Sequence, residues 1–169
     1  MPAKKTVQLR AKKLAGTRPS VQAPLRRVLF LCSGNFYRSR YAEALFNHQA
    51  RAADWPWRAF SRGLSTHLIG GDLSIHTRRA LLRRGIALAQ TGPTRRHLTR
   101  ADLVSAAHVV ALKESEHRPI IRARFPDHDS RVEYWRVHDL DAASPSETLA
   151  AIDAQVARLA KKLLKVKQN

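Results

Sequence analysis

The sequence contains a single cysteine, Cys32, and only 13 acidic residues against 31 lysines and arginines. One cysteine excludes a framework held together by disulfide bonds. No long apolar run is present, which argues against a membrane-spanning helix, and the first residues do not resemble the apolar core of a secretory signal. We therefore expect a soluble, cytoplasmic protein whose 169 residues suffice for one domain with a substantial core.

The shortage of acids gives a formal net charge of +18. Such an excess attracts polyanions and would also steer phosphorylated molecules towards a binding site. Residues 1–25 contain six lysines and arginines and no acid, so we predict a basic, disordered N-terminal arm followed by a domain over residues 26–169. Nucleic acid binding through this arm is one interpretation, although the sequence contains neither zinc-finger spacing nor an RNA-binding aromatic motif.

Short apolar runs alternate with segments of helical periodicity along the chain. The expected strands cover residues 28–31, 57–61, 108–112 and 132–137. The expected helices cover residues 39–51, 75–84, a short stretch after Thr99, residues 114–124 and a final helix from residue 145, with Ile75, Leu81 and Leu82 on the inner face of the second. This alternation predicts an α/β fold, a three-layer sandwich with a four-stranded parallel sheet and helices on both faces. Ligands of such sheets bind at the carboxyl ends of the strands.

The first strand leads directly into a loop suited to a phosphate group. Cys32 ends the strand, and Gly34, Asn35, Arg38 and Ser39 follow before the helix begins. Gly34, and less readily Asn35, can adopt positive φ, so the loop can turn its amides inward. Those amides and the helix N-terminus form a cradle for an oxyanion, while the planar guanidinium of Arg38 can hold two phosphate oxygens. The loop therefore predicts a phosphate-binding site.

The same loop favours Cys32 as a nucleophile. A cysteine beside a cation and a helix N-terminus is stabilised as the thiolate, and Ser39 could donate a hydrogen bond to the sulfur. A lone cysteine after an apolar strand is more commonly a small buried hydrophobe. The combination of strand, cysteine, Gly-Asn, Arg-Ser and helix onset in one window favours the catalytic interpretation.

This window resembles the loop of the low-molecular-weight protein tyrosine phosphatases, in which a cysteine, five residues, an arginine and a serine follow one another. The matching residues are Cys32, Gly34, Asn35, Arg38, Ser39, Ala42 and Glu43. The resemblance implies hydrolysis of a phosphomonoester through a cysteinyl-phosphate, without a metal or cofactor. It assigns the nucleophile to Cys32 and the phosphate clamp to Arg38, and it assigns substrate or phosphate binding to Ser33, Gly34, Asn35, Phe36, Tyr37 and Ser39. Ser61 would support the loop.

A general acid is expected after the last strand, because the leaving group needs a proton. Family members place an Asp-Pro pair there, and Asp139, followed by Leu140, matches it best; Asp141 is the alternative. Aromatic residues usually follow that aspartate and are absent here, so we expect either that Phe36 and Tyr37 supply the wall of the cleft or that the substrate is not a phosphotyrosine.

Three further positions depart from the family pattern. Tyr37 replaces a frequent second cysteine, and Arg40 replaces a proline; both are expected to line or flank the mouth. Lys113 stands where the third strand of the family commonly leads into an acid.

Two other functions remain as alternatives. Arsenate reductases share the loop, but with one cysteine this chain would need an external thiol. A non-catalytic protein that binds phosphate or nucleic acid is the second alternative. The expected partner of the leading hypothesis is a phosphorylated protein or a small phosphomonoester, with phosphotyrosine and phosphoarginine both open and no membrane involved.

The histidines lack metal-ligand spacing, and we expect His97, His117 and His128 to be surface or loop residues.

Overall fold

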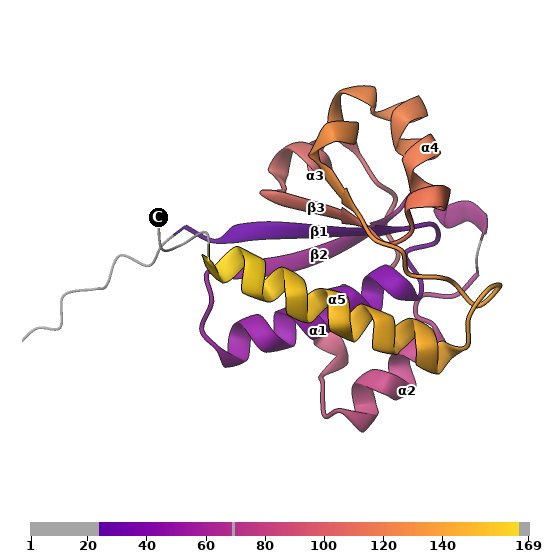
Figure 1. Ribbon diagram of the computed structural model, residues 1–169. Coiled ribbons are helices and arrows are strands. Elements are labelled where there is room, and N and C mark those ends of the chain that lie inside the picture. Colours follow the sequence, from indigo (N-terminus) through magenta and orange to yellow (C-terminus); the bar gives the residue numbers. More distant parts are fainter. Residues whose placement is uncertain (1–23, 69, 166–169) are drawn as a thin grey trace, which may run out of the picture.

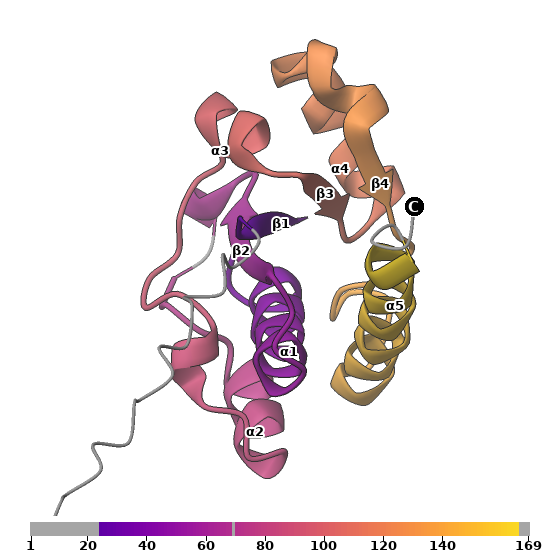
Figure 2. The same ribbon diagram turned by 90° about the vertical axis from the view of Figure 1, so that its left-hand side faces the viewer.

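The computed structural model describes residues 24–68 and 70–165 and contains all four predicted strands (Figures 1 and 2). They are β1 (Arg26–Cys32), β2 (Trp57–Gly63), β3 (His108–Ala111) and β4 (Val132–Tyr134). The strands pair in the order β2-β1-β3-β4, and every pairing is parallel. The predicted parallel sheet is therefore confirmed. The basic arm lies outside the described residues except for Pro24 and Leu25.

Helices cover both faces of the sheet (Figure 2). One face carries α1 (Arg38–Ala52) and α5 (Pro145–Lys165), which contact each other, and α2 (Ile75–Arg83) packs against α1. The opposite face carries α3 (Arg100–Ser105) and α4 (Glu114–Arg124). Short 3-10 helices occupy Thr66–Leu68, Leu88–Gln90 and Pro126–Arg131. None of the helices in the described part of the chain is long and apolar enough to cross a membrane.

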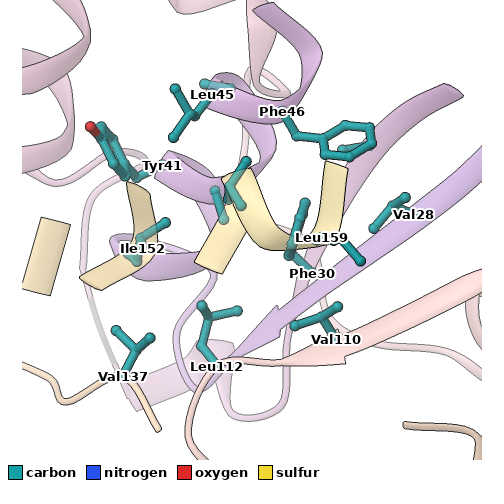
Figure 3. Close-up of a cluster of buried hydrophobic side chains, with 14 of the residues drawn as sticks. Val28, Phe30, Tyr41, Leu45, Phe46, Val110, Leu112, Val137, Ile152 and Leu159 are labelled. Atoms are coloured by element: carbon teal, nitrogen blue, oxygen red, sulfur yellow. The ribbon is translucent and has the colours of Figure 1, made fainter. Parts of the chain in front are cut away.

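The central strand β1 is buried on both sides, as its apolar run predicts. Val28 and Phe30 pack with side chains of α1 and α5 in the cluster drawn in Figure 3. Leu29 and Leu31 point to the other face, where they meet residues of α3 and α4. The alternation fixes β1 between two hydrophobic layers, so the residue that ends it, Cys32, has a fixed position at the carboxyl edge.

Local start and stop signals agree with the structure. Ser74 caps α2 by accepting a bond from the His76 amide, and Gly85, with φ of 65°, follows its end. Thr99 and Asp102 form the expected capping box at α3.

The expectation for the inner face of α2 was partly wrong. Leu81 is buried, but Ile75 and Leu82 are 49% and 59% exposed. At about 100° per residue, both lie opposite the stripe that contains Leu81, and small residues, Thr77 and Ala80, complete that stripe. The short helix buries only this narrow side against α1.

The fourth strand is shorter than expected. It ends at Tyr134, and the chain then crosses the end of β3 through an antiparallel bridge between Lys113 and Arg136. The Val137 amide donates to the Leu112 carbonyl at 2.9 Å. This crossing carries the segment with Asp139 towards the loop that follows β1.

Candidate active site

The loop of residues 33–37 joins β1 to α1 at the carboxyl edge of the sheet. Its carbonyl groups are held outwards by neighbouring segments, through bonds from Leu64 N to Cys32 O at 3.0 Å, Ser65 N to Ser33 O at 2.8 Å and Ser74 N to Phe36 O at 2.9 Å. Carbonyls fixed outwards let the loop amides turn towards the enclosed space, the arrangement that binds an anion. The N-terminus of α1 has no side-chain cap and no acid in its first turn, which keeps it favourable to a negative group.

Asn35 is the loop residue with left-handed backbone, at φ of 50°, whereas Gly34 does not adopt positive φ. Its amide nitrogen donates to Ser61 Oγ at 2.8 Å and to Ser39 Oγ at 3.2 Å, and its oxygen accepts from the Arg96 amide at 2.8 Å. Asn35 thus joins the loop to β2 and to the segment before α3. These three bonds offset the modest cost of the left-handed conformation, which asparagine tolerates well.

The sulfur of Cys32 lies 2.9 Å from the hydroxyl of Ser39, and both residues are buried. Because Asn35 donates to the Ser39 oxygen, the hydroxyl proton of Ser39 is available to the sulfur. A donor in this position stabilises a sulfur anion. The pair is therefore suited to hold a thiolate next to the bound group.

Arg38 is 1% exposed and contacts two carboxylates. Its two terminal nitrogens lie 3.2 Å from the two oxygens of Glu116, and Nη2 lies 2.6 Å from Asp139 Oδ2. Burial alone would lower the pKa of Arg38, but the neighbouring Cys32, Glu116 and Asp139 raise it, so the guanidinium stays charged. Its terminal nitrogens are held by Glu116, by Asp139 and, at 3.4 Å from Nη1, by the Val137 carbonyl, so the buried guanidinium has a fixed orientation.

Glu116 was not identified from the sequence. It lies in the first turn of α4, and besides Arg38 it accepts a hydrogen bond from Ser33 Oγ. Burial alone would raise the pKa of Glu116, but His117, Arg38 and Ser33 lower it far below its ordinary value. The rule that ligands lie at strand ends points to it, because Glu116 follows the end of β3 by about one helical turn.

Ser61 reaches the loop through Asn35, as the resemblance implies, and it donates to Glu43 Oε2 at 2.6 Å. Thr91 donates to the same oxygen at 2.7 Å and accepts from Arg40 Nε at 2.6 Å. Burial raises the pKa of Glu43, although the hydroxyls of Ser61 and Thr91 and the nearby Arg40 oppose this. A continuous polar network therefore lies beneath the loop.

The expectation that Arg40 lines or flanks the mouth was wrong. Arg40 is 2% exposed. Beyond Thr91, its guanidinium donates to the carbonyl of Asp72 at 3.1 Å and to that of Gly92. Burial lowers the pKa of Arg40, while Glu43 and Asp72 partly oppose the change. A residue that replaces the family's proline thus fastens two loops from below.

One cavity of about 190 Å³ opens above the loop. Its lining comprises Cys32, Gly34, Phe36, Tyr37, Arg38, Ser74, Asp139 and Leu140. Asp139 is one-third exposed, whereas the alternative acid Asp141 is 73% exposed and lies 4.0 Å from Lys113 Nζ. The cavity therefore brings together the three residues expected to act in catalysis, while Ser33, Asn35, Ser39 and Ser61 support it from outside its lining.

The expectation for two histidines was wrong. His117 is fully buried and His128 is 7% exposed. The Lys113 amide donates to Nδ1 of His117 at 3.1 Å, so Nε2 carries the proton, and it lies 3.2 Å from Ser33 Oγ. Burial lowers the pKa of His117, and the nearby Arg38 and Lys113 lower it further. His117 thus supports the loop as a neutral ring.

Residues 24–68 and 70–165 contain no group of three or more His, Cys, Asp or Glu side chains that could hold a metal ion. The arrangement itself offers a sulfur nucleophile, a fixed guanidinium and a carboxyl group around one small cavity. Such a set can bind a phosphoryl group, attack it and protonate a leaving oxygen.

Several solved structures share this fold. YfkJ from Bacillus subtilis is 24% identical, with a TM-score of 0.77 over 87% of this chain and 99% of that one. A low molecular weight protein tyrosine phosphatase from Bacillus subtilis is 27% identical, with a TM-score of 0.70 over 84% and 99%. The YwlE arginine phosphatase from Geobacillus stearothermophilus is 24% identical, with a TM-score of 0.68 over 85% and 97%. Curated protein sequences give no significant match.

The family model for low molecular weight phosphotyrosine protein phosphatases matches residues 27–169. This range includes the whole loop, both flanking layers and Asp139. The match extends the resemblance from the short loop to nearly the full domain, and the chain belongs to the low molecular weight phosphotyrosine protein phosphatase family.

Proposed function

We propose that this phosphatase hydrolyses phosphomonoesters through a cysteinyl-phosphate, with Cys32 as nucleophile, Arg38 as phosphate clamp and Asp139 as general acid. The observation that carries the proposal is the shared cavity of about 190 Å³, which these three side chains line. The proposed substrate is a phosphorylated protein or a small phosphomonoester.

In the first step, the thiolate of Cys32 attacks phosphorus and forms the S–P bond. The bond between phosphorus and the leaving oxygen breaks, and the carboxyl proton of Asp139 passes to that oxygen. The loop amides and Arg38 stabilise the charge on the equatorial oxygens. Ser39, 2.9 Å from the sulfur, holds the thiolate before attack.

In the second step, water attacks phosphorus while the Asp139 carboxylate accepts its proton. The S–P bond breaks, inorganic phosphate leaves, and the sulfur returns to the thiolate with Ser39 as its hydrogen-bond donor. Asp139 is thereby protonated again and ready for the next cycle. Contact with Arg38 at 2.6 Å keeps this carboxyl at the cavity, whereas Asp141 points into solvent.

Turnover of an aryl phosphate tests the proposal. We expect Cys32→Ser to abolish turnover and Asp139→Asn to lower kcat by roughly 10²–10⁴-fold. Asp141→Asn is the matched control and should retain most of the activity. Rapid quenching should trap a phosphoenzyme with the native protein, and more of it with Asp139→Asn. Native turnover no greater than that of Cys32→Ser would refute the proposal, and a large loss in Asp141→Asn alone would reassign the acid.

A further inference from the structure

A second hollow lies next to the proposed catalytic cavity. Its volume is about 430 Å³, and its lining comprises Lys113, Glu114, Ser115, Arg136 and His138. His138 directly precedes Asp139, which lines the catalytic cavity, so the two spaces are neighbours at the carboxyl edge of the sheet. We call this space, with its cations Lys113 and Arg136, the basic hollow.

The crossing after β4 brings the two cations together. Lys113 and Arg136 are directly paired in an antiparallel bridge, and the Glu114 amide donates to the Trp135 carbonyl at 2.8 Å. Residues opposite each other in such a bridge have Cα atoms about 4.5–5.5 Å apart. His138, two positions after Arg136, adds an imidazole to the same lining. The backbone pairing thus places the two cationic side chains on the same side of the bridge.

Nearby acids only partly neutralise these cations. Arg136 is 88% exposed, and its Nε lies 3.8 Å from Glu114, whose other oxygen is 2.7 Å from Arg118. Lys113 Nζ lies 3.9 Å from Glu116 and 4.0 Å from Asp141, too far for a direct hydrogen bond to either. Both side chains therefore retain donors for another anion.

We propose that the basic hollow binds an acidic side chain beside the phosphorylated residue of a polypeptide substrate. The proposal rests on the proposed function, because it places the phosphoryl group in the neighbouring cavity. Charge complementarity supports an acidic occupant, and the same cations disfavour a basic side chain at that position. An extended peptide advances about 3.3 Å per residue, so the acidic residue lies within a few positions of the phosphorylated one.

Binding to the Cys32→Ser protein tests the inference without requiring turnover. The probes are two phosphotyrosine peptides that differ only in their flanking residues, aspartates in one and asparagines in the other. We expect the acidic peptide to bind roughly threefold to tenfold more tightly, as ion pairs with the exposed Arg136 and the largely buried Lys113 would provide. The advantage should shrink as salt is added.

Variants that remove positive charge test whether the preference for the acidic peptide comes from the basic hollow or from the overall charge of the protein. Lys113→Met with Arg136→Gln should bring the affinity ratio of the two peptides to about one, and Arg136→Gln alone, at an exposed position, should lower it by about half. The matched control is Arg158→Gln with Lys161→Met on the exposed side of α5, which removes the same charge and should keep the native ratio. Equal affinity of the native site for both peptides, or a preference that survives the first double variant, would overturn the inference.

Turnover of the same peptides distinguishes this inference from the proposed function. A native protein that prefers the acidic peptide in binding but hydrolyses neither would refute the proposed function and leave the basic hollow supported. Hydrolysis of both peptides with equal kcat/KM and equal affinity would refute the basic hollow alone.

Discussion

Arg38 and Glu116 meet edge to edge: the two terminal nitrogens of the guanidinium each lie 3.2 Å from one oxygen of the carboxylate. The first residue comes from the start of α1 and the second from the start of α4, on opposite faces of the sheet. This pair ties the two layers together at the carboxyl edge. It also orients the arginine that is proposed to hold the phosphoryl group.

Replacing Glu116 by Gln should destabilise the domain by about 1–3 kcal/mol, because the buried guanidinium of Arg38 loses one of its two carboxylate partners. The loss should appear in urea unfolding, together with a higher KM for an aryl phosphate as Arg38 becomes less well positioned. Glu114→Gln, in the same helical turn but paired only with surface arginines, should change stability by less than about 0.5 kcal/mol. Equal stability of the two variants would show that the Arg38–Glu116 pair does not hold the layers together.

Gly63 lies directly beneath the loop. A Cβ atom there would lie 2.9 Å from both the Asn35 nitrogen and the Ser33 oxygen. Because backbone atoms cannot move aside without shifting the loop, Gly63→Ala should cost about 1–3 kcal/mol and most of the aryl phosphatase activity. Gly92→Ala is the control, since its nearest contact is 4.0 Å away. Full activity of Gly63→Ala would contradict a loop held rigidly by β2.

Features encoded locally could be predicted from the sequence. Ser144 and Glu147 form a cap at the start of the predicted final helix, because both residues act within one turn of the same helix. The loop from Cys32 to Ser39 is also local. The sulfur and the hydroxyl that meet there belong to residues only seven positions apart, so one short stretch of sequence encodes the strand, the loop and the start of the helix. Asp139 could be placed because carboxyl ends of parallel strands share one edge.

Features that depend on distant packing could not be predicted. Glu116 and Ser33 are 83 positions apart, and only the fold brings them together. Arg40 was expected at the mouth of the site, because the neighbouring sequence does not reveal the hydrogen-bond acceptors that a buried arginine needs. Its acceptors come from residues 72, 91 and 92. His117 was misplaced because the Ser33 hydroxyl that its Nε2 meets is 84 positions away, although its other partner, the Lys113 amide, is local.

The buried guanidinium of Arg40 donates to the hydroxyl of Thr91 and to the carbonyl of Asp72. Arg40→Lys keeps the charge but cannot supply these bonds together, so we expect a loss of about 3 kcal/mol in the free energy of unfolding. Arg79→Lys, on the exposed side of α2, should stay within about 0.5 kcal/mol of the native protein. Thermal and urea unfolding measure both. Native-like stability of Arg40→Lys would mean that the charge alone suffices at this position.

The buried ring of His117 should make the domain less stable in mild acid. Its pKa is lowered from 6.5 in the folded protein by burial and by the nearby Arg38 and Lys113, although the neighbouring Glu116 opposes the change. Below pH 6.5, the ordinary pKa of histidine, the unfolded chain binds a proton that the folded protein excludes. The free energy of unfolding therefore falls as the pH decreases, with a limiting slope of about 1.4 kcal/mol per pH unit. Urea unfolding between about pH 7 and about pH 5 should therefore show a steeper loss for the native protein than for His117→Gln. Arg40→Lys, destabilised for a different reason, should keep the native slope. An unchanged slope in His117→Gln would mean that other groups cause the acid sensitivity, and that His117 can be protonated in place beside Ser33.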